Sequence, residues 1–405
     1  MKIVLVFTST RADFGLLNPL IKQLQTNQDV KTVLFVTGTH LDEKFGLTIS
    51  EIKKSFPDLE RLEVRWTMDS SVSHHQLSLM ANSFSLFAKS LENKKIDLAI
   101  VLGDRFETFC FASVCATLKI PLAHLHGGEL TFGALDDKYR HCITKLSELH
   151  FVSAEKYRER VIQLGESPNK VFDVGALGVE NSLVIKLRTL EELASATGLK
   201  LTKNVFMMTF HPETNAADFG IPLFKLFLEK LAAWLKTQSD FCVVASGTNV
   251  DQGGEHVRQM LDVFGHTVGD KFMFVESLGA VNYLSMVKNA IAILGNSSSG
   301  VIEANSLGTP TVNVGFRQDG RECDPTVIQI SGSKDLAKFD FSQVVGLKKG
   351  NSSWDKSIYF KPETSRQMAN HIYNFLNHSM RTETKKFYDL NTNTKTSKTR
   401  NGGEG

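Results

Sequence analysis

Ionisable side chains gather in three short stretches between Leu102 and His141, where charged residues interrupt apolar runs. These stretches are residues 103–107 (GDRFE), 124–129 (HLHGGE) and 136–141 (DDKYRH). Together they contain carboxylates, imidazoles and guanidinium groups. Crowded carboxylates raise one another's pKa, so that one can act as an acid while another acts as a base. The three stretches therefore predict acid–base chemistry on an anionic substrate.

Asp104 comes directly after an apolar run, where a parallel strand would end and a helix begin. A carboxylate there could simply cap the helix. However, ligands bind at the carboxyl ends of such strands, and other ionisable residues lie in the neighbouring turns. Asp104 is therefore a candidate catalytic group. His124 and His126 share one face of a strand, as two metal ligands would, but no clear third ligand is present and no metal site is predicted.

In the second half of the chain, residues 295–300 (GNSSSG) follow a buried apolar run and open a helix. Backbone N–H groups at a helix start, together with serine hydroxyls, bind anions. Glu303 falls one turn further on, where its carboxylate could accept hydrogen bonds from ribose hydroxyls. The alternative is that a serine merely caps the helix. Because three serines flanked by glycines exceed what a cap requires, the motif predicts a phosphate site.

Three further residues could reach an anionic ligand. Arg317 lies on a loop after the run 311–314, and its planar guanidinium fork suits phosphate oxygens. His211 ends a strand-like run and either contacts substrate or caps a loop. Arg11 could reach a diphosphate or simply lie near a helix start. Its turn, residues 10–15 (TRADFG), lacks the GxGxxG pattern, which argues against a nicotinamide dinucleotide.

Strand-like and helix-like segments alternate along the chain, which is typical of parallel βαβ units. We expect strands at residues 3–7, 32–36, 98–102, 122–125, 149–153, 171–174, 205–210, 241–245, 290–294 and 311–314. We expect helices at 16–25, 42–54, 76–93, 138–147, 154–164, 183–201, 223–237, 298–306 and 364–377. Two successive α/β halves predict a pair of doubly wound domains with a binding cleft between them.

The predicted organisation is a first domain at residues 1–180 that carries the acid–base residues, a second domain at 181–362, a helix at 363–380 and a partly disordered tail at 381–405. A net charge of +2 gives no reason to expect nucleic-acid or membrane binding. The five cysteines are scattered and no apolar run reaches membrane-span length, so we predict a cytoplasmic protein with reduced thiols.

Seven ordered motifs carry a family resemblance. They lie at residues 10–15, 103–107, 124–129, 136–141, 211–214, 295–303 and 315–321. Together they resemble the hydrolysing UDP-N-acetylglucosamine 2-epimerases of bacterial sialic-acid and capsule biosynthesis, over nearly the whole chain to about Asn377. The resemblance implies a GT-B-like α/β fold with two Rossmann-like, doubly wound domains, an interdomain cleft, and UDP held mainly by the second domain. It also implies no cofactor, and a homodimer or homotetramer.

Carried over motif by motif, Asp104 and Asp136 match two catalytic acidic positions of that family. Many members have glutamate where this chain has His126, so either His126 or Glu129 takes the third acid–base role, and we favour a shared site. The family pattern also implies a set of UDP contacts. These are Arg11, Arg105, His211, Asn249, Ser297, Ser298, Glu303 and Arg317.

The reaction implied by the resemblance converts UDP-N-acetylglucosamine to N-acetylmannosamine and UDP, by elimination to 2-acetamidoglucal and rehydration. Three alternatives remain open. The first is the same reaction on a UDP-2,4-diacetamido-trideoxy sugar, as in legionaminic-acid pathways. The second is a GT-B glycosyltransferase, and the third is a UDP-sugar-binding protein without catalytic activity.

Overall fold

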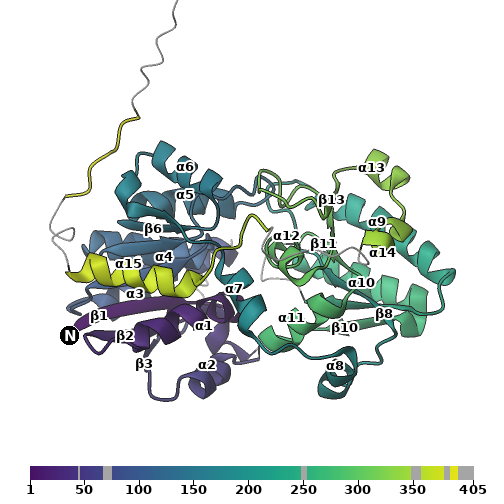
Figure 1. Cartoon of the computed structure of the whole chain (residues 1–405), viewed down its shortest axis with the longest axis horizontal. Coiled ribbons are helices and arrows are strands. Elements are labelled where there is room, and N and C mark those ends of the chain that lie inside the picture. The colour runs from purple at the N-terminus through teal and green to yellow at the C-terminus, as the bar shows by residue number, and fades with distance from the viewer. Residues whose placement is uncertain (44–45, 67–74, 248–252, 348–356, 378–383, 391–405) are drawn as a thin grey trace, which may run out of the picture.

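Two parallel β-sheets, each flanked by helices, form the two halves of the molecule (Figure 1). The structure is a computed structural model that describes residues 1–43, 46–66, 75–247, 253–347, 357–377 and 384–390. Within these residues the first sheet has the order β3-β2-β1-β4-β5-β6-β7 and the second has the order β10-β9-β8-β11-β12-β13. The predicted GT-B-like α/β fold is therefore confirmed.

The strands of the first sheet are β1 (Lys2–Thr8), β2 (Val30–Val36), β3 (Glu60–Glu63), β4 (Leu98–Leu102), β5 (Leu122–Leu125), β6 (Leu149–Val152) and β7 (Val171–Asp173). Those of the second sheet are β8 (Asn204–Thr209), β9 (Phe241–Ser246), β10 (Phe272–Val275), β11 (Ala292–Gly295), β12 (Thr311–Val314) and β13 (Val327–Ile330).

The helices of the first half are α1 (Arg11–Gln25), α2 (Ile49–Ser55), α3 (His75–Leu91), α4 (Phe106–Thr117), α5 (Asp136–Leu146), α6 (Glu155–Gln163) and α7 (Leu177–Val184). Those that follow are α8 (Leu190–Thr197), α9 (Ile221–Lys236), α10 (Gly254–Val268), α11 (Gly279–Asn289), α12 (Ser298–Ile302), α13 (Ser333–Lys338), α14 (Phe341–Leu347) and α15 (Thr364–Asn377). Within the described part of the chain, none of them combines the length and apolarity that a bilayer crossing requires.

Four predicted helices differ from the structure by more than two residues, and the one predicted at 298–306 ends at Ile302. Helix α1 begins at Arg11 and not at residue 16, because Thr10 and Asp13 cap it reciprocally: each side chain accepts a hydrogen bond from the other residue's backbone N–H. The helix predicted at 42–54 starts only at Ile49. The helix predicted at 183–201 is wrong as one element, since α7 ends at Val184 and a capping box on Thr189 starts α8 separately.

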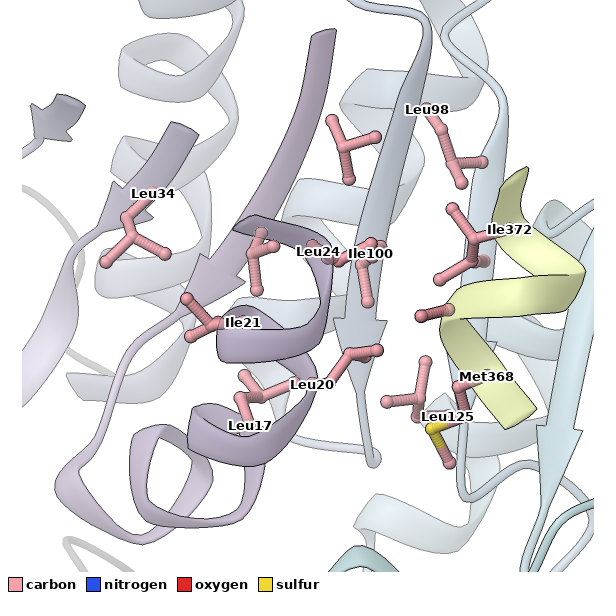
Figure 2. Packing of buried hydrophobic residues seen from close by; sticks show 14 of the residues in the cluster. Leu17, Leu20, Ile21, Leu24, Leu34, Leu98, Ile100, Leu125, Met368 and Ile372 are labelled. Carbon is pink, nitrogen blue, oxygen red and sulfur yellow. The ribbon is translucent and has the colours of Figure 1, made fainter. Parts of the chain in front are cut away.

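The C-terminal helix α15 returns to the first half of the molecule. Leu17, Leu20 and Ile21 of α1 pack with Met368 and Ile372 of α15 in one buried cluster (Figure 2). Both helices cover the same face of the first sheet, and a separate apolar cluster forms the core around the second sheet. Burial of this kind contributes about 1.5–3 kcal/mol for each large side chain, so the last helix is an integral part of the first half.

Beyond α15, residues 384–390 lie against the first half of the molecule, while residues 378–380 of the predicted helix segment and residues 381–383 and 391–405 of the predicted tail lie outside the described residues. The ammonium group of Lys385 contacts the buried carboxylate of Glu166 at 2.8 Å. His150 Nε2 lies 3.0 Å from the same oxygen, Oε2, and Lys145 contacts the other oxygen, Oε1, at 2.5 Å. The backbone N–H of Tyr388 donates to Gly165 O.

We expect Glu166→Gln to destabilise the protein by about 1–3 kcal/mol at pH 7. Burial raises the pKa of Glu166, but hydrogen bonds from His150, Lys145 and Lys385 outweigh burial and hold the pKa at about 2, against an ordinary value of 4.5. Because the folded-state pKa is lowered, this stabilisation is present above pH 4.5 and is lost as the pH falls toward 2. Urea unfolding of the wild type and of Glu166→Gln, from pH 7 to pH 3, measures the difference in their free energies of unfolding. A gap in unfolding free energy that does not narrow toward pH 3 would contradict the assignment.

Candidate active site

The loops at the carboxyl ends of the two sheets' strands meet directly. Phe132, in the loop after β5, donates its N–H to Asp319 O in the loop after β12 at 3.0 Å. Asn215, after β8, donates its N–H to Gly133 O at 3.2 Å. Thr214 Oγ1 accepts from the Leu135 N–H at 2.9 Å. These bonds hold the acid–base motifs of the first sheet against the anion-binding motifs of the second.

Arg140 organises the acidic groups of the first half. It projects from α5, is 1% exposed, and forms an ion pair with the Asp104 carboxylate. Its other hydrogen bonds go to Thr131 Oγ1 at 3.0 Å, to Glu129 O at 2.9 Å and to Asp137 Oδ1 at 3.0 Å. One guanidinium group thus fixes Asp104, the loop after β5 and the start of α5 relative to one another.

His126 and Glu129 form a buried pair in the loop after β5. His126 Nδ1 lies 2.8 Å from Glu129 Oε1, and the backbone of His126 adopts a left-handed conformation with φ of 64°. The same carboxylate oxygen accepts from Ser153 Oγ at 2.7 Å, and Oε2 accepts from Arg321 Nη2 at 2.5 Å. Among the described residues, His126 Nε2 is buried and has no hydrogen-bond partner. A buried imidazole nitrogen in this state is suited to a ligand or a substrate proton.

The charges of this pair are coupled to Glu303 of the second half. Burial raises the pKa of Glu129, but Arg321, His126 and Arg140 outweigh burial and lower the pKa far below its ordinary value, so Glu129 is a carboxylate. Burial also raises the pKa of Glu303, and the neighbouring Ser299 hydroxyl and the charges of His126 and Arg321 lower that pKa only in part. Burial opposes the charge on Arg321, yet Glu129 and, more weakly, Asp104 help to raise its pKa.

Asp104, His126, Glu129 and Glu303 are therefore brought together around Arg321, which comes from the loop after β12. The network around Arg140 reaches Asp137, which accepts from the Thr131 N–H at 2.6 Å. The predicted catalytic Asp136 is the first residue of α5, and its charge raises the pKa of Tyr139 together with burial of that phenol.

On the second sheet, the buried Asn296 fixes two predicted UDP contacts. Its side chain accepts from the His211 N–H at 2.7 Å and donates to His211 O at 2.8 Å. Its backbone oxygen accepts from Arg317 Nη1 at 3.1 Å and from Gln318 Nε2 at 2.8 Å. Burial, then the charges of Arg317 and Arg105, lower the pKa of His211 well below its ordinary value. Arg105, from the first half, therefore acts on His211 from across the junction.

The serine motif opens α12 as predicted. Ser297 is the N-cap and its side chain accepts from the Ser299 N–H at 3.4 Å, while Ser298 is the first helical residue. The capping role that was the alternative interpretation is thus observed for Ser297. Glu303 directly follows the helix and its carboxylate packs so closely on Gly178 that a methyl group there would overlap Oε1.

The remaining predicted residues either have partners of their own or lie outside the described residues. Arg11 forms an ion pair of 3.7 Å with Glu51, in which the two side chains are 31% and 46% exposed. Arg105 Nε donates to the buried Glu107 at 3.2 Å. Asn249 lies outside the described residues. His124 contacts Thr144 through Nδ1 and the backbone oxygen after β4 through Nε2, and burial lowers its pKa to about 3, so it is a neutral structural histidine.

Sequence reasoning did not select Arg140, Asn296 or Arg321 as functional residues. All three residues lie inside motifs that were recognised, at residues 136–141, 295–303 and 315–321. These residues are only 1%, 0% and 6% exposed, and the sequence alone does not show this burial. Burial would have marked the two arginines as functional candidates, because a buried arginine requires paired acidic partners.

We expect Gly133→Ala to loosen the junction. A Cβ at Gly133 would lie 2.6 Å from Phe316 O and 2.7 Å from the backbone of Arg317, closer than real side chains pack. The Phe132 and Asn215 amides, which bond across the junction, should then exchange with deuterium at least about tenfold faster, equivalent to a loss of roughly 1.4 kcal/mol of local stability. Gly332→Ala is the control, since nothing lies within 4 Å of its added Cβ. Unchanged exchange at both amides would contradict the close contact.

The chain is similar to known proteins over most of its length. Residues 22–373 match the family model described as UDP-N-acetylglucosamine 2-epimerase. A Campylobacter jejuni protein named GDP/UDP-N,N'-diacetylbacillosamine 2-epimerase (hydrolyzing) is 36% identical over 78% of this chain and 81% of its own. The polysialic acid biosynthesis protein P7 of Escherichia coli is 34% identical over 96% of this chain and 98% of its own.

Among solved structures, the UDP-GlcNAc 2-epimerase from Neisseria meningitidis bound to UDP-GlcNAc superimposes with a TM-score of 0.75. The alignment covers 92% of this chain and all of that chain at 19% identity, which supports the shared fold. The fold agrees with the long sequence matches and with the family model, which spans most of the chain. This protein is therefore a member of the UDP-N-acetylglucosamine 2-epimerase family.

Proposed function

We propose that the protein is a hydrolysing 2-epimerase that converts UDP-N-acetylglucosamine to N-acetylmannosamine and UDP. The observation that carries the proposal is the meeting of two groups around Arg321: the acid–base residues of the first half and Glu303 of the second. A nucleotide sugar that spans the junction would place its sugar carbons beside the first group and its nucleotide beside the second. Family membership supports the same reaction class.

The chemistry explains why two protonation states are needed. The proton on sugar C2 is not acidified by a carbonyl group, so its removal is coupled to the departure of UDP from C1. The C2–H bond and the C1–O bond break, a C1–C2 double bond forms, and the product is 2-acetamidoglucal. Water then adds to C1 while a proton is delivered to C2 on the opposite face. One group must accept a proton and another must donate one.

In this proposal His126 and not Glu129 is the proton-transferring group of the pair. Glu129 accepts hydrogen bonds from Ser153 and Arg321 and contacts His126 Nδ1, and these partners lower its pKa, so it is a poor base. It holds Nδ1 in place, as a carboxylate does behind a catalytic histidine. Nε2, which has no hydrogen-bond partner among the described residues, is then the atom that exchanges a proton with substrate.

Asp104 is the proposed partner of His126 in proton transfer. Its side chain is 24% exposed, which leaves the carboxylate accessible at the junction while Arg140 fixes its position. Asp136, at the start of α5, stays the predicted second carboxylate of the family pattern.

For the nucleotide, we propose that Glu303 accepts hydrogen bonds from the ribose and that positive charge around His211 stabilises the departing diphosphate. Arg317 and Arg105 both act on the buried His211, from the two sides of the junction. Such fixed cations favour the transition state in which negative charge develops on the leaving group. Ser297 and Ser298 complete this proposed set, and the Arg11 and Asn249 contacts stay predictions from the sequence, as do the oligomeric state and the cytoplasmic location.

A second substrate is favoured by two relatives, one from Campylobacter jejuni and one from Legionella pneumophila, whose names both include diacetylbacillosamine. The Campylobacter jejuni protein that is 36% identical is named for diacetylbacillosamine, a 2,4-diacetamido-trideoxy sugar. The same elimination applies to that nucleotide, because C1 and C2 carry the same groups. Incubation of the purified protein with each UDP-sugar, followed by separation of the free sugars, distinguishes them. We expect N-acetylmannosamine and UDP from UDP-N-acetylglucosamine. Release from the diacetamido nucleotide alone would assign the second substrate, and no free UDP from either would refute the proposal.

A further inference from the structure

We propose that Arg321 is a positioning residue that completes the His126–Glu129 pair only when the two halves of the molecule are closed on each other. This inference rests on the proposed function, in which His126 transfers the proton. The added condition is that the acid–base pair of the first half depends on a side chain supplied by the second half.

The ion pair spans the junction and is almost fully enclosed. Glu129 follows β5 of the first sheet and Arg321 follows β12 of the second, 192 residues later. Their side chains are 3% and 6% exposed, and Arg321 Nη2 lies 2.5 Å from Glu129 Oε2. A bridge between two such buried charges is costly to break, because each partner left alone would be an unpaired charge away from water.

The guanidinium of Arg321 is bonded within the second half as well as to Glu129 of the first half. Its Nη1 donates to Gln318 Oε1 at 2.8 Å, and Gln318 Nε2 donates to the backbone oxygen of Asn296 at 2.8 Å. Asn296 also fixes His211 and accepts from Arg317. The position of Arg321 therefore depends on the arrangement of the proposed nucleotide site, through Gln318 and Asn296.

In the first half, the two carboxylate oxygens of Glu129 contact different halves of the molecule. Oε1 contacts Ser153 and His126 of the first half, whereas Oε2 accepts from Arg321 of the second. Without Arg321, Oε2 would be a buried anion with no cation at hydrogen-bond distance, and the carboxylate would turn toward another donor. The acceptor that holds His126 Nδ1 would then be lost.

We infer that this bond breaks and re-forms during turnover. His126 Nε2 is buried and has no hydrogen-bond partner in the described part of the chain, and the loops after β5 and β12 are bonded to each other, so separation of these loops would open a path for the sugar. Separation removes Arg321 from Glu129, and closure over a bound nucleotide restores it. The proton-transferring histidine is thus assembled by closure, which protects the reactive glucal from premature release.

The test uses Arg321→Gln, Arg321→Lys and Glu129→Gln in the full-length protein. We expect Arg321→Gln to lower kcat for UDP release about 100-fold, while KM and the dissociation constant of UDP rise by a smaller factor, less than about tenfold, because the lost bond also favours closure over the nucleotide. Arg321→Lys should recover part of kcat, because it restores the charge without the planar fork. The double variant should lose no more than the worse single variant, since both changes break the same bond.

Lys156→Gln is the matched control. Lys156 forms an exposed ion pair with Glu322, which also joins the two halves but does not reach Glu129, so kcat should stay within about twofold. The inference is overturned if Arg321→Gln weakens UDP binding as much as it lowers kcat, if it leaves kcat unchanged, or if the losses in the double variant multiply.

A readout without turnover separates this inference from the proposed function. In the UDP-bound protein, the Nδ1–H proton of His126 should give a protected NMR signal, assigned through its absence in His126→Gln. Arg321→Gln should abolish that signal and Lys156→Gln should retain it. A wild-type protein that shows this pattern but releases no UDP from a sugar nucleotide would refute the proposed function alone. A signal that persists in Arg321→Gln would refute the inference alone.

Discussion

His126→Gln is expected to lower kcat for UDP release about 10³-fold, with the dissociation constant of UDP unchanged within about threefold. Glutamine keeps a side-chain amide that can contact Glu129 and fill the space, but it cannot carry a proton to or from C2. The imidazole is 11% exposed and contacts protein only through Nδ1 among the described bonds, so the fold should survive its replacement. Initial rates of UDP release and calorimetric UDP binding give the two quantities.

Two further variants make this result specific to position 126. His126→Glu introduces the residue that many members of the family carry, and it should recover at least about tenfold of the lost rate, because a carboxyl group can transfer a proton where an amide cannot. His266→Gln, an exposed histidine on α10, should leave kcat unchanged. If His126→Gln retained more than about a tenth of the wild-type rate, His126 would be excluded as the proton-transferring group.

Asp104→Asn is expected to have a comparable effect, a loss in kcat of about 10³-fold with UDP binding retained. The amide oxygen can still accept from Arg140, and Asp137 continues to pair with that guanidinium, so the network should persist without the proton acceptor. Asp262→Asn on α10, an exposed position, is the matched control. Thermal unfolding checks that both variants are folded. A normal rate for folded Asp104→Asn would show that Asp104 takes no part in proton transfer.

The alternation of strands and helices was predictable because the central parallel strands are buried on both faces. Such strands form continuous apolar runs, as β4 does with LAIVL. The strands that the sequence analysis missed are β3, β10 and β13, and each lies at the edge of a sheet. Their side chains are partly exposed, as in ERLE of β3, so no apolar run marks them.

The convergence of Asp104, His126 and Glu129 was also predictable, because residues that follow neighbouring parallel strands meet at one edge of the sheet. The division of roles between His126 and Glu129 was not predictable from the sequence. It depends on Arg321, which is 192 residues away in sequence and approaches only through the packing of one half on the other. Local spacing carries no information about such a contact. The ion pair of Arg11 with Glu51, which lies within the first half, was likewise not predictable from local spacing.

The most direct test of the account is to run the reaction of the wild-type protein on UDP-N-acetylglucosamine in deuterium oxide and to examine the products by mass spectrometry and proton NMR. The account predicts free UDP together with N-acetylmannosamine that carries deuterium at C2, because the C2 proton is lost to a protein side chain and replaced from solvent. Free UDP with a sugar product that retains its original C2 proton would contradict elimination across C1 and C2, and with it the proposed roles of Asp104 and His126.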